Sequence, residues 1–190
     1  MMGAARLHTP EPLPLPPVVS AIFDAPRLSG ASRYTHWGFY ICDAWLWTGS
    51  KGLDPATLAQ PFAITLRYAR EFSGPVIARR CVEEMQALGL GTYTDRAEWL
   101  RWLSSAMPDV EVGDVMTNVF RPGAGLTLFL NDEPQATSRD TGLACAFFST
   151  WLDARTRSPC LRAALLAGAN GPQQAPRSGP APQTGSPLRP

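Results

Sequence analysis

The chain has 190 residues, enough for one ordinary domain with a substantial core. Its 17 basic and 16 acidic residues leave a net charge of +1, without the basic excess that binding to a phosphate backbone requires. No run of residues approaches the roughly 18 apolar residues that span a bilayer. We therefore expect neither nucleic-acid binding nor a membrane span.

Both ends of the chain are rich in proline. Residues 1–17 contain five prolines and residues 169–190 contain six. Proline removes a backbone donor, and neither stretch carries enough apolar surface to offset the entropy of ordering it. The composition predicts disordered ends at 1–17 and 169–190 around a single domain at 18–168.

The first residues do not form the apolar core of a signal peptide, because a proline run follows Arg6. As printed, the chain is expected in the cytoplasm. A start codon further upstream that encodes a signal peptide would place the protein in the periplasm instead. The sequence does not predict an oligomeric state.

Cysteine and histidine are too few and too scattered for the common metal sites. The four cysteines are Cys42, Cys81, Cys145 and Cys160, and the two histidines are His8 and His36. Their spacing matches no zinc motif, and the last three cysteines fall in expected helices, where a thiol is usually a small buried apolar group. We expect no metal and no cofactor.

Two stretches in the first half of the chain predict β-strands. Residues 34–47 are mostly aromatic or apolar and lie between Gly30 and Gly49, which indicates one long strand with a bend at Gly38. Residues 62–70 alternate between apolar and more polar side chains, the period of a half-buried strand.

Helical spacing follows these strands. Apolar residues over 77–88 recur every three or four positions, and Gly89 fits the position after the last turn. A second helix is expected to begin at Asp95, with Glu98 as its capping-box partner, and to end before Pro108. This helix pair is expected to pack on the sheet.

The second half of the chain predicts a hairpin and two more helices. Residues 110–120 and 126–130 read as strands joined by a reversal at 122–125. Asp140 is placed to cap one helix, and Pro159 occupies the first position of another. The order of elements predicts an α+β fold with an antiparallel β-sheet covered by helices.

Four blocks of the sequence resemble the chalcone isomerase-like family. They are LSGASRYTHWGFYICDAWLW (28–47), CVEEMQALGLGTYTD (81–95), VEVGDVMTNVFRPGAGLTLFLN (110–131) and DTGLACAFFSTWLDARTRSPCLRAALLAG (140–168). The last two are similar to the bacterial branch. The resemblance implies an open-faced β-sandwich with an apolar cleft between the sheet and its helices.

Arg33 opens the aromatic strand. By its residue type it fits either an anion anchor at the mouth of an apolar cleft or an exposed arginine at a strand end. The resemblance places it where the plant isomerases use an arginine to guide the substrate oxyanion, and where fatty-acid-binding relatives hold a carboxylate.

Tyr40 and Cys42 are two positions apart and are expected to share one face of a strand. Tyr40 fits either a hydroxyl donor to a ligand or a core aromatic whose hydroxyl reaches the surface. In the bacterial relatives a tyrosine usually occupies the position of Cys42. Together with the resemblance, these observations predict Arg33, Tyr40 and Cys42 as ligand-binding residues.

The isomerases place a tyrosine, a lysine and an asparagine just ahead of a Cys-Val pair. Anchored on Cys81-Val82, those positions hold Ser73, Val76 and Arg80, so none of the three is retained. The resemblance thus implies a non-catalytic protein that binds a small apolar or amphipathic ligand, such as a fatty acid.

Two alternatives stay open at this point. One is an intramolecular lyase or isomerase that acts on a chalcone-like phenolic enone through Arg33. The other is a partner-binding role with the proline-rich tail as a docking segment.

Overall fold

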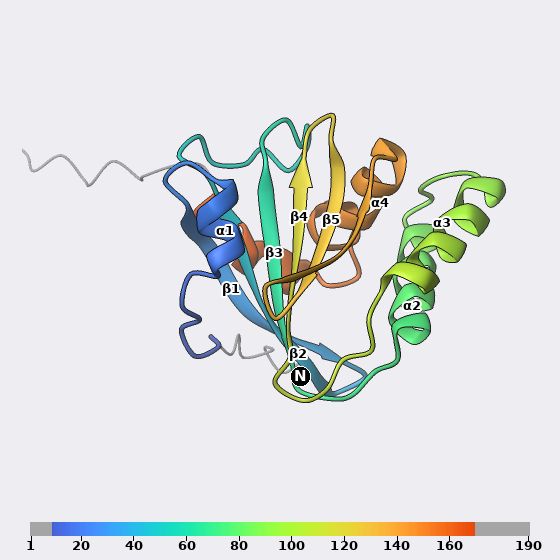
Figure 1. Cartoon of the computed structure of the whole chain (residues 1–190), viewed down its shortest axis with the longest axis horizontal. Helices are drawn as coiled ribbons and strands as arrows, with labels where there is room; N and C mark the ends of the chain where they lie inside the picture. Colours follow the sequence, from blue (N-terminus) through green and yellow to red (C-terminus); the bar gives the residue numbers. More distant parts are fainter. Residues whose placement is uncertain (1–8, 170–190) are drawn as a thin grey trace, which may run out of the picture.

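The computed structural model describes residues 9–169, which form one antiparallel sheet with helices on both faces (Figure 1). The strands are β1 (Arg27–His36), β2 (Phe39–Thr48), β3 (Phe62–Tyr68), β4 (Val115–Arg121), β5 (Gly125–Leu130) and β6 (Glu133–Ser138). The helices are α1 (Pro17–Ile22), α2 (Gly74–Ala87), α3 (Tyr93–Ala106), α4 (Thr141–Leu152) and α5 (Pro159–Leu165). The six strands lie in chain order, each antiparallel to the next. The predicted α+β class is confirmed.

Alternation along the strands divides the interior into two cores. Ala44 and Leu46 of β2 contribute to the larger core, which lies between the sheet and α2 to α5. Trp45 and Trp47 point the other way, into a smaller core that α1 covers with Val18 and other apolar side chains. The sheet is therefore buried on both faces along much of its length.

Several predicted elements are confirmed. The alternating stretch forms β3, the helical spacing forms most of α2, and Pro159 is the first residue of α5. Asp140 caps α4, since its carboxylate accepts a hydrogen bond from the amide of Leu143 at 3.0 Å. These elements depend on interactions between residues close together in sequence.

The single long strand expected at 34–47 is wrong. β1 and β2 are two strands of a hairpin, and Trp37 and Gly38 form its turn with φ of +53° and +78°. Turns of this kind usually carry Asn or Gly at both central positions. Because tryptophan occupies the first turn position, the turn could not be distinguished in the sequence from the aromatic residues on either side of it.

A β-bulge in this hairpin overturns the expectation that Tyr40 and Cys42 share a face. Tyr34 pairs with Cys42 and Thr35 pairs with Tyr40, so Ile41 is an extra residue in β2. One extra residue shifts the alternation of the strand. Cys42 consequently faces the helices, whereas Tyr40 lies on the opposite face, against Arg33.

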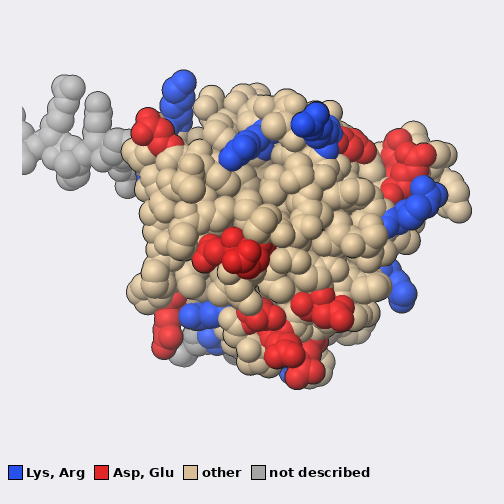
Figure 2. Space-filling model, viewed as in Figure 1, with Lys and Arg blue, Asp and Glu red and all other residues tan. Residues whose placement is uncertain are grey.

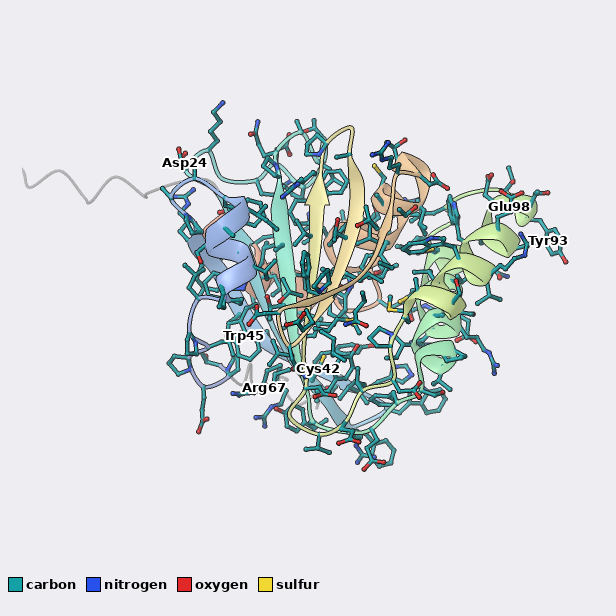
Figure 3. All side chains as sticks on the ribbon, in the orientation of Figure 1. Asp24, Cys42, Trp45, Arg67, Tyr93 and Glu98 are labelled. Atoms are coloured by element: carbon teal, nitrogen blue, oxygen red, sulfur yellow. The ribbon has the colours of Figure 1, made fainter. Side chains whose placement is uncertain are left out.

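The start of α3 also differs from the expectation. Its N-cap is Thr92, and Asp95 is the capping-box partner three residues later. The Asp95 carboxylate accepts hydrogen bonds from the amide and the hydroxyl of Thr92, each at 2.7 Å. Glu98, predicted as that partner, is exposed toward the outer end of the helix pair (Figure 3).

The predicted disordered ends are only partly within the described residues. Pro16 is buried, Leu13 packs against the smaller core, and Pro17 begins α1. Ala169 is buried, and its carbonyl accepts a hydrogen bond from the amide of Leu53 at 3.0 Å. Residues 1–8 and 170–190 lie outside the described part.

Charges on the described surface are mixed in sign. On the face seen in Figure 2, basic and acidic side chains form small separate groups among uncharged residues. Among residues 9–169, none of the helices has the length and apolar character needed to cross a membrane.

Candidate functional site

A cavity of about 310 Å³ lies between the β1–β3 part of the sheet and helices α2, α4 and α5. Most of its wall is apolar, with Ile41 and Leu66 from the sheet, Ile77 from α2 and Leu161 from α5. This volume is at the lower end of the range of roughly 300–1,000 Å³ for ligand pockets. The cavity therefore fits a small ligand.

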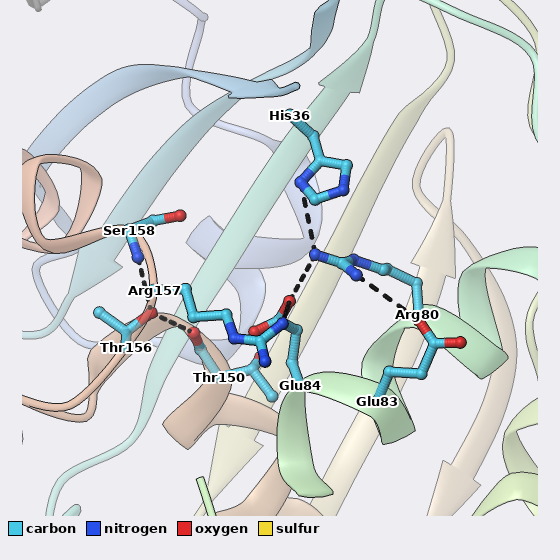
Figure 4. Close-up of polar contacts among 8 residues, drawn as sticks. All are labelled: His36, Arg80, Glu83, Glu84, Thr150, Thr156, Arg157 and Ser158. Atoms are coloured by element: carbon cyan, nitrogen blue, oxygen red, sulfur yellow. Dashed lines mark hydrogen bonds and ion pairs between the residues drawn. The ribbon is translucent and has the colours of Figure 1, made fainter. Parts of the chain in front are cut away.

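Two polar side chains of the cavity, His36 and Glu84, contact Arg80 (Figure 4). Arg80 and Glu84 lie one turn apart on α2, and Arg80 Nη2 is 2.5 Å from Glu84 Oε1. The same nitrogen lies 3.3 Å from Nδ1 of His36, which comes from the end of β1. Helix α2 and the β1–β2 hairpin thus bring their polar groups to one side of the cavity.

The connection between α4 and α5 supplies further polar groups. The Thr156 hydroxyl donates to the carbonyl of Thr150 at 2.9 Å and accepts from the amide of Ser158 at 3.4 Å. Arg157 lies between Thr156 and Ser158 in the sequence, and its Nη1 is 3.9 Å from Glu84 Oε1. Glu84 therefore faces two arginines.

Burial shifts the pKa of other ionisable groups of the cavity in the direction that favours their uncharged forms. It raises the pKa of the Tyr34 hydroxyl and of the Cys42 thiol, and it raises the pKa of Cys81 to about 12. Burial and the nearby Arg80 lower the pKa of His36. At neutral pH the charges of the site thus come from arginine and glutamate side chains.

Only one of the three predicted site residues lines the cavity. Cys42 does, whereas Arg33 and Tyr40 lie on the other face of the sheet. There the Arg33 guanidinium lies 3.9 Å from the Tyr40 ring centroid, and its Nε is 3.4 Å from Asp43 Oδ1. The structure therefore does not bring the three residues together.

Arg80 and Glu84 are the charged cavity residues that the sequence reasoning missed. One signal was available, because the alignment on Cys81-Val82 put Val76 and Arg80 at two positions that the isomerases use, and both line the cavity. Ser73, at the third position, is the N-cap of α2. Residues 9–169 hold no group of three or more His, Cys, Asp and Glu side chains placed for a metal ion.

No protein family model and no curated protein sequence matches this chain. Among solved structures, the chain is similar to a fatty-acid binding protein of Arabidopsis thaliana, with a TM-score of 0.61 and 11% sequence identity. The match covers 78% of this chain and 90% of that chain. The chain has the chalcone isomerase fold. The architecture that the sequence blocks implied is therefore confirmed, and at this identity the likeness shows the fold alone.

Proposed function

We propose that the protein is non-catalytic and binds a small apolar or amphipathic ligand in this cavity. The observation that carries the proposal is the cavity itself, with a mostly apolar wall and polar groups gathered around Arg80. Such an arrangement suits a ligand with an apolar body and one polar end. The chalcone isomerase fold shared with a fatty-acid binding protein supports the same class of ligand, of which a fatty acid is one member.

The chemistry of the cavity favours binding over turnover. The positions at which the isomerases carry tyrosine, lysine and asparagine hold Ser73, Val76 and Arg80. Thiolates are the nucleophilic form of cysteine, and burial raises the pKa of Cys42 and Cys81 further above neutral pH, so it disfavours their thiolates.

The proposal is tested by native mass spectrometry of the full chain, followed by extraction of any bound molecule. Val76 lines the cavity and is 48% exposed, so Val76→Trp places a large side chain at its mouth. Val112, 66% exposed and not among the lining residues, provides the matched control Val112→Trp. We expect the parent and Val112→Trp to carry a ligand and Val76→Trp to lose it.

The same variants separate the alternatives. Equal ligand content in the parent and Val76→Trp would contradict binding in this cavity. Turnover of a chalcone-like phenolic enone by the parent, abolished by Val76→Trp and kept by Val112→Trp, would favour the isomerase instead.

A further inference from the structure

The arginine that faces the cavity is already paired. Glu84, with a side chain only 16% exposed, holds one Arg80 nitrogen at 2.5 Å, and Glu83 lies 3.5 Å from the other terminal nitrogen. The Arg80 side chain is 35% exposed, so solvent screens this pair incompletely. Arg80 is therefore not an unpaired cation, and an anionic ligand would compete with these two glutamates for it.

The charges around Arg80 cancel. Arg80 and Arg157 are matched by Glu83 and Glu84, and His36 is held toward its neutral form by burial and by Arg80. A carboxylate head group would add a negative charge beside Glu84. Because the Glu84 side chain is only 16% exposed, solvent screens its charge incompletely, and a second carboxylate beside it would be repelled unless it displaced Glu84 from Arg80.

An uncharged hydroxyl meets no such repulsion. A hydroxyl donates one hydrogen bond and accepts others, whereas a carboxylate only accepts. The cavity offers a carboxylate acceptor in Glu84 and donors in Arg80 and the Tyr34 hydroxyl. A hydroxyl head group therefore satisfies both kinds of partner without adding charge.

We propose that the cavity selects ligands with an uncharged, hydroxyl-bearing head group, as in a fatty alcohol, over the corresponding fatty-acid anion. This inference rests on the proposed function, since it names the head group of the ligand bound at that same site.

The test compares 1-octanol with octanoate, two probes of equal chain length. Isothermal titration calorimetry of the full chain is carried out at about pH 8, where the acid is ionised. We expect octanol to bind tighter by on the order of tenfold, the usual difference for one contact to a charged group. Equal or tighter binding of octanoate would overturn the inference and leave the proposed function intact. Binding of neither probe would overturn both.

A pair of variants tests the role of Glu84. Glu84→Gln keeps the shape of the side chain and removes the competing charge, so octanoate should bind on the order of tenfold tighter while octanol changes by less than about threefold. Glu83→Gln is the matched control. Glu83 also pairs with Arg80, so this variant removes one negative charge as well, but Glu83 is 55% exposed and does not line the cavity. An equal gain in both variants would mean that general electrostatics, and not Glu84, sets the preference.

Folding of Glu84→Gln is checked by circular dichroism. If this variant does not fold, octanamide decides the matter with the parent protein. It has the same acyl chain as octanoate without the charge, and its amide both donates and accepts hydrogen bonds, so we expect it to bind more tightly than octanoate. Weaker or equal binding would overturn the inference.

Discussion

Arg33 and Asp43 form an ion pair across β1 and β2 on the face of the sheet that points away from the cavity, with Nε 3.4 Å from Oδ1. Asp43 is 1% exposed and also receives Arg67 Nη2 at 3.1 Å. Because Arg67 belongs to β3, the Asp43 carboxylate links three neighbouring strands. The position of Arg33 thus indicates a structural role.

Removal of Asp43 is expected to destabilise the fold. Asp43→Ala leaves two arginines side by side without their shared carboxylate, and we expect a loss of about 3 kcal/mol in the free energy of unfolding.

Arg33→Ala should lower the free energy of unfolding by only about 1 kcal/mol, because Arg67 still pairs with Asp43. Urea unfolding measures both. Arg33→Ala should leave ligand affinity unchanged, and a loss of affinity without a loss of stability would show that Arg33 is a ligand anchor.

The β1–β2 turn is a place where a substitution should stabilise the protein. Trp37 has φ of +53° and is 86% exposed, so its side chain gains little from packing while the backbone is strained. Trp37→Asn should raise the free energy of unfolding by about 1 kcal/mol, since Asn tolerates this conformation. Gly38→Ala, at φ of +78° with open space around the new methyl group, should lower it by about 1 kcal/mol. A destabilised Trp37→Asn would show that the exposed ring contributes to stability.

The capping box of α3 predicts a dependence of stability on pH. Hydrogen bonds from the amide and hydroxyl of Thr92 hold the pKa of Asp95 below its usual value of 3.8. Near that pH the unfolded chain binds more protons than the folded protein, so this contribution is present above 3.8 and is lost as the pH falls through the lower folded pKa.

Unfolding free energies of the parent and Asp95→Asn, measured across the acid range, test this contribution. The parent should be the more stable protein near neutral pH, and the difference should shrink toward strongly acid pH. Glu98→Gln is the control, because Glu98 is exposed and takes no part in the capping box. A difference that does not vary with pH would contradict the assignment.

The four cysteines are expected to react at two different rates. Cys145 and Cys160 are exposed, whereas Cys42 and Cys81 line the cavity. Burial raises the pKa of Cys42 and of Cys81, and it also raises the pKa of Cys145, although that side chain still reaches solvent. With N-ethylmaleimide at about pH 8, the exposed pair should react at least tenfold faster, because the reagent reaches these side chains and the thiolate is the reactive form. Peptide mass spectrometry follows the labelling of each cysteine.

Saturating 1-octanol should slow the labelling of Cys81 further. Unchanged labelling of Cys81 would argue against a ligand in the cavity.

The sequence alone was sufficient to predict those helices and strands that are determined by residues within the same element. The alternation of β3, the apolar spacing of α2 and the Asp140 cap of α4 each depend on residues a few positions apart. Strand β6 escaped prediction because it is an exposed edge strand that contains Pro134 and has little apolar pattern.

The tertiary structure decided which side chains reach the cavity. One extra residue in β2, Ile41, turns Tyr40 to the opposite face and leaves Cys42 in the cavity wall. The pairing of β1 with β2 places Arg33 beside Asp43, and the packing of α2 brings Arg80 to His36. The physical reason is that the register of a sheet depends on a partner strand and a one-residue shift exchanges its faces, whereas the sequence of one strand records only the alternation.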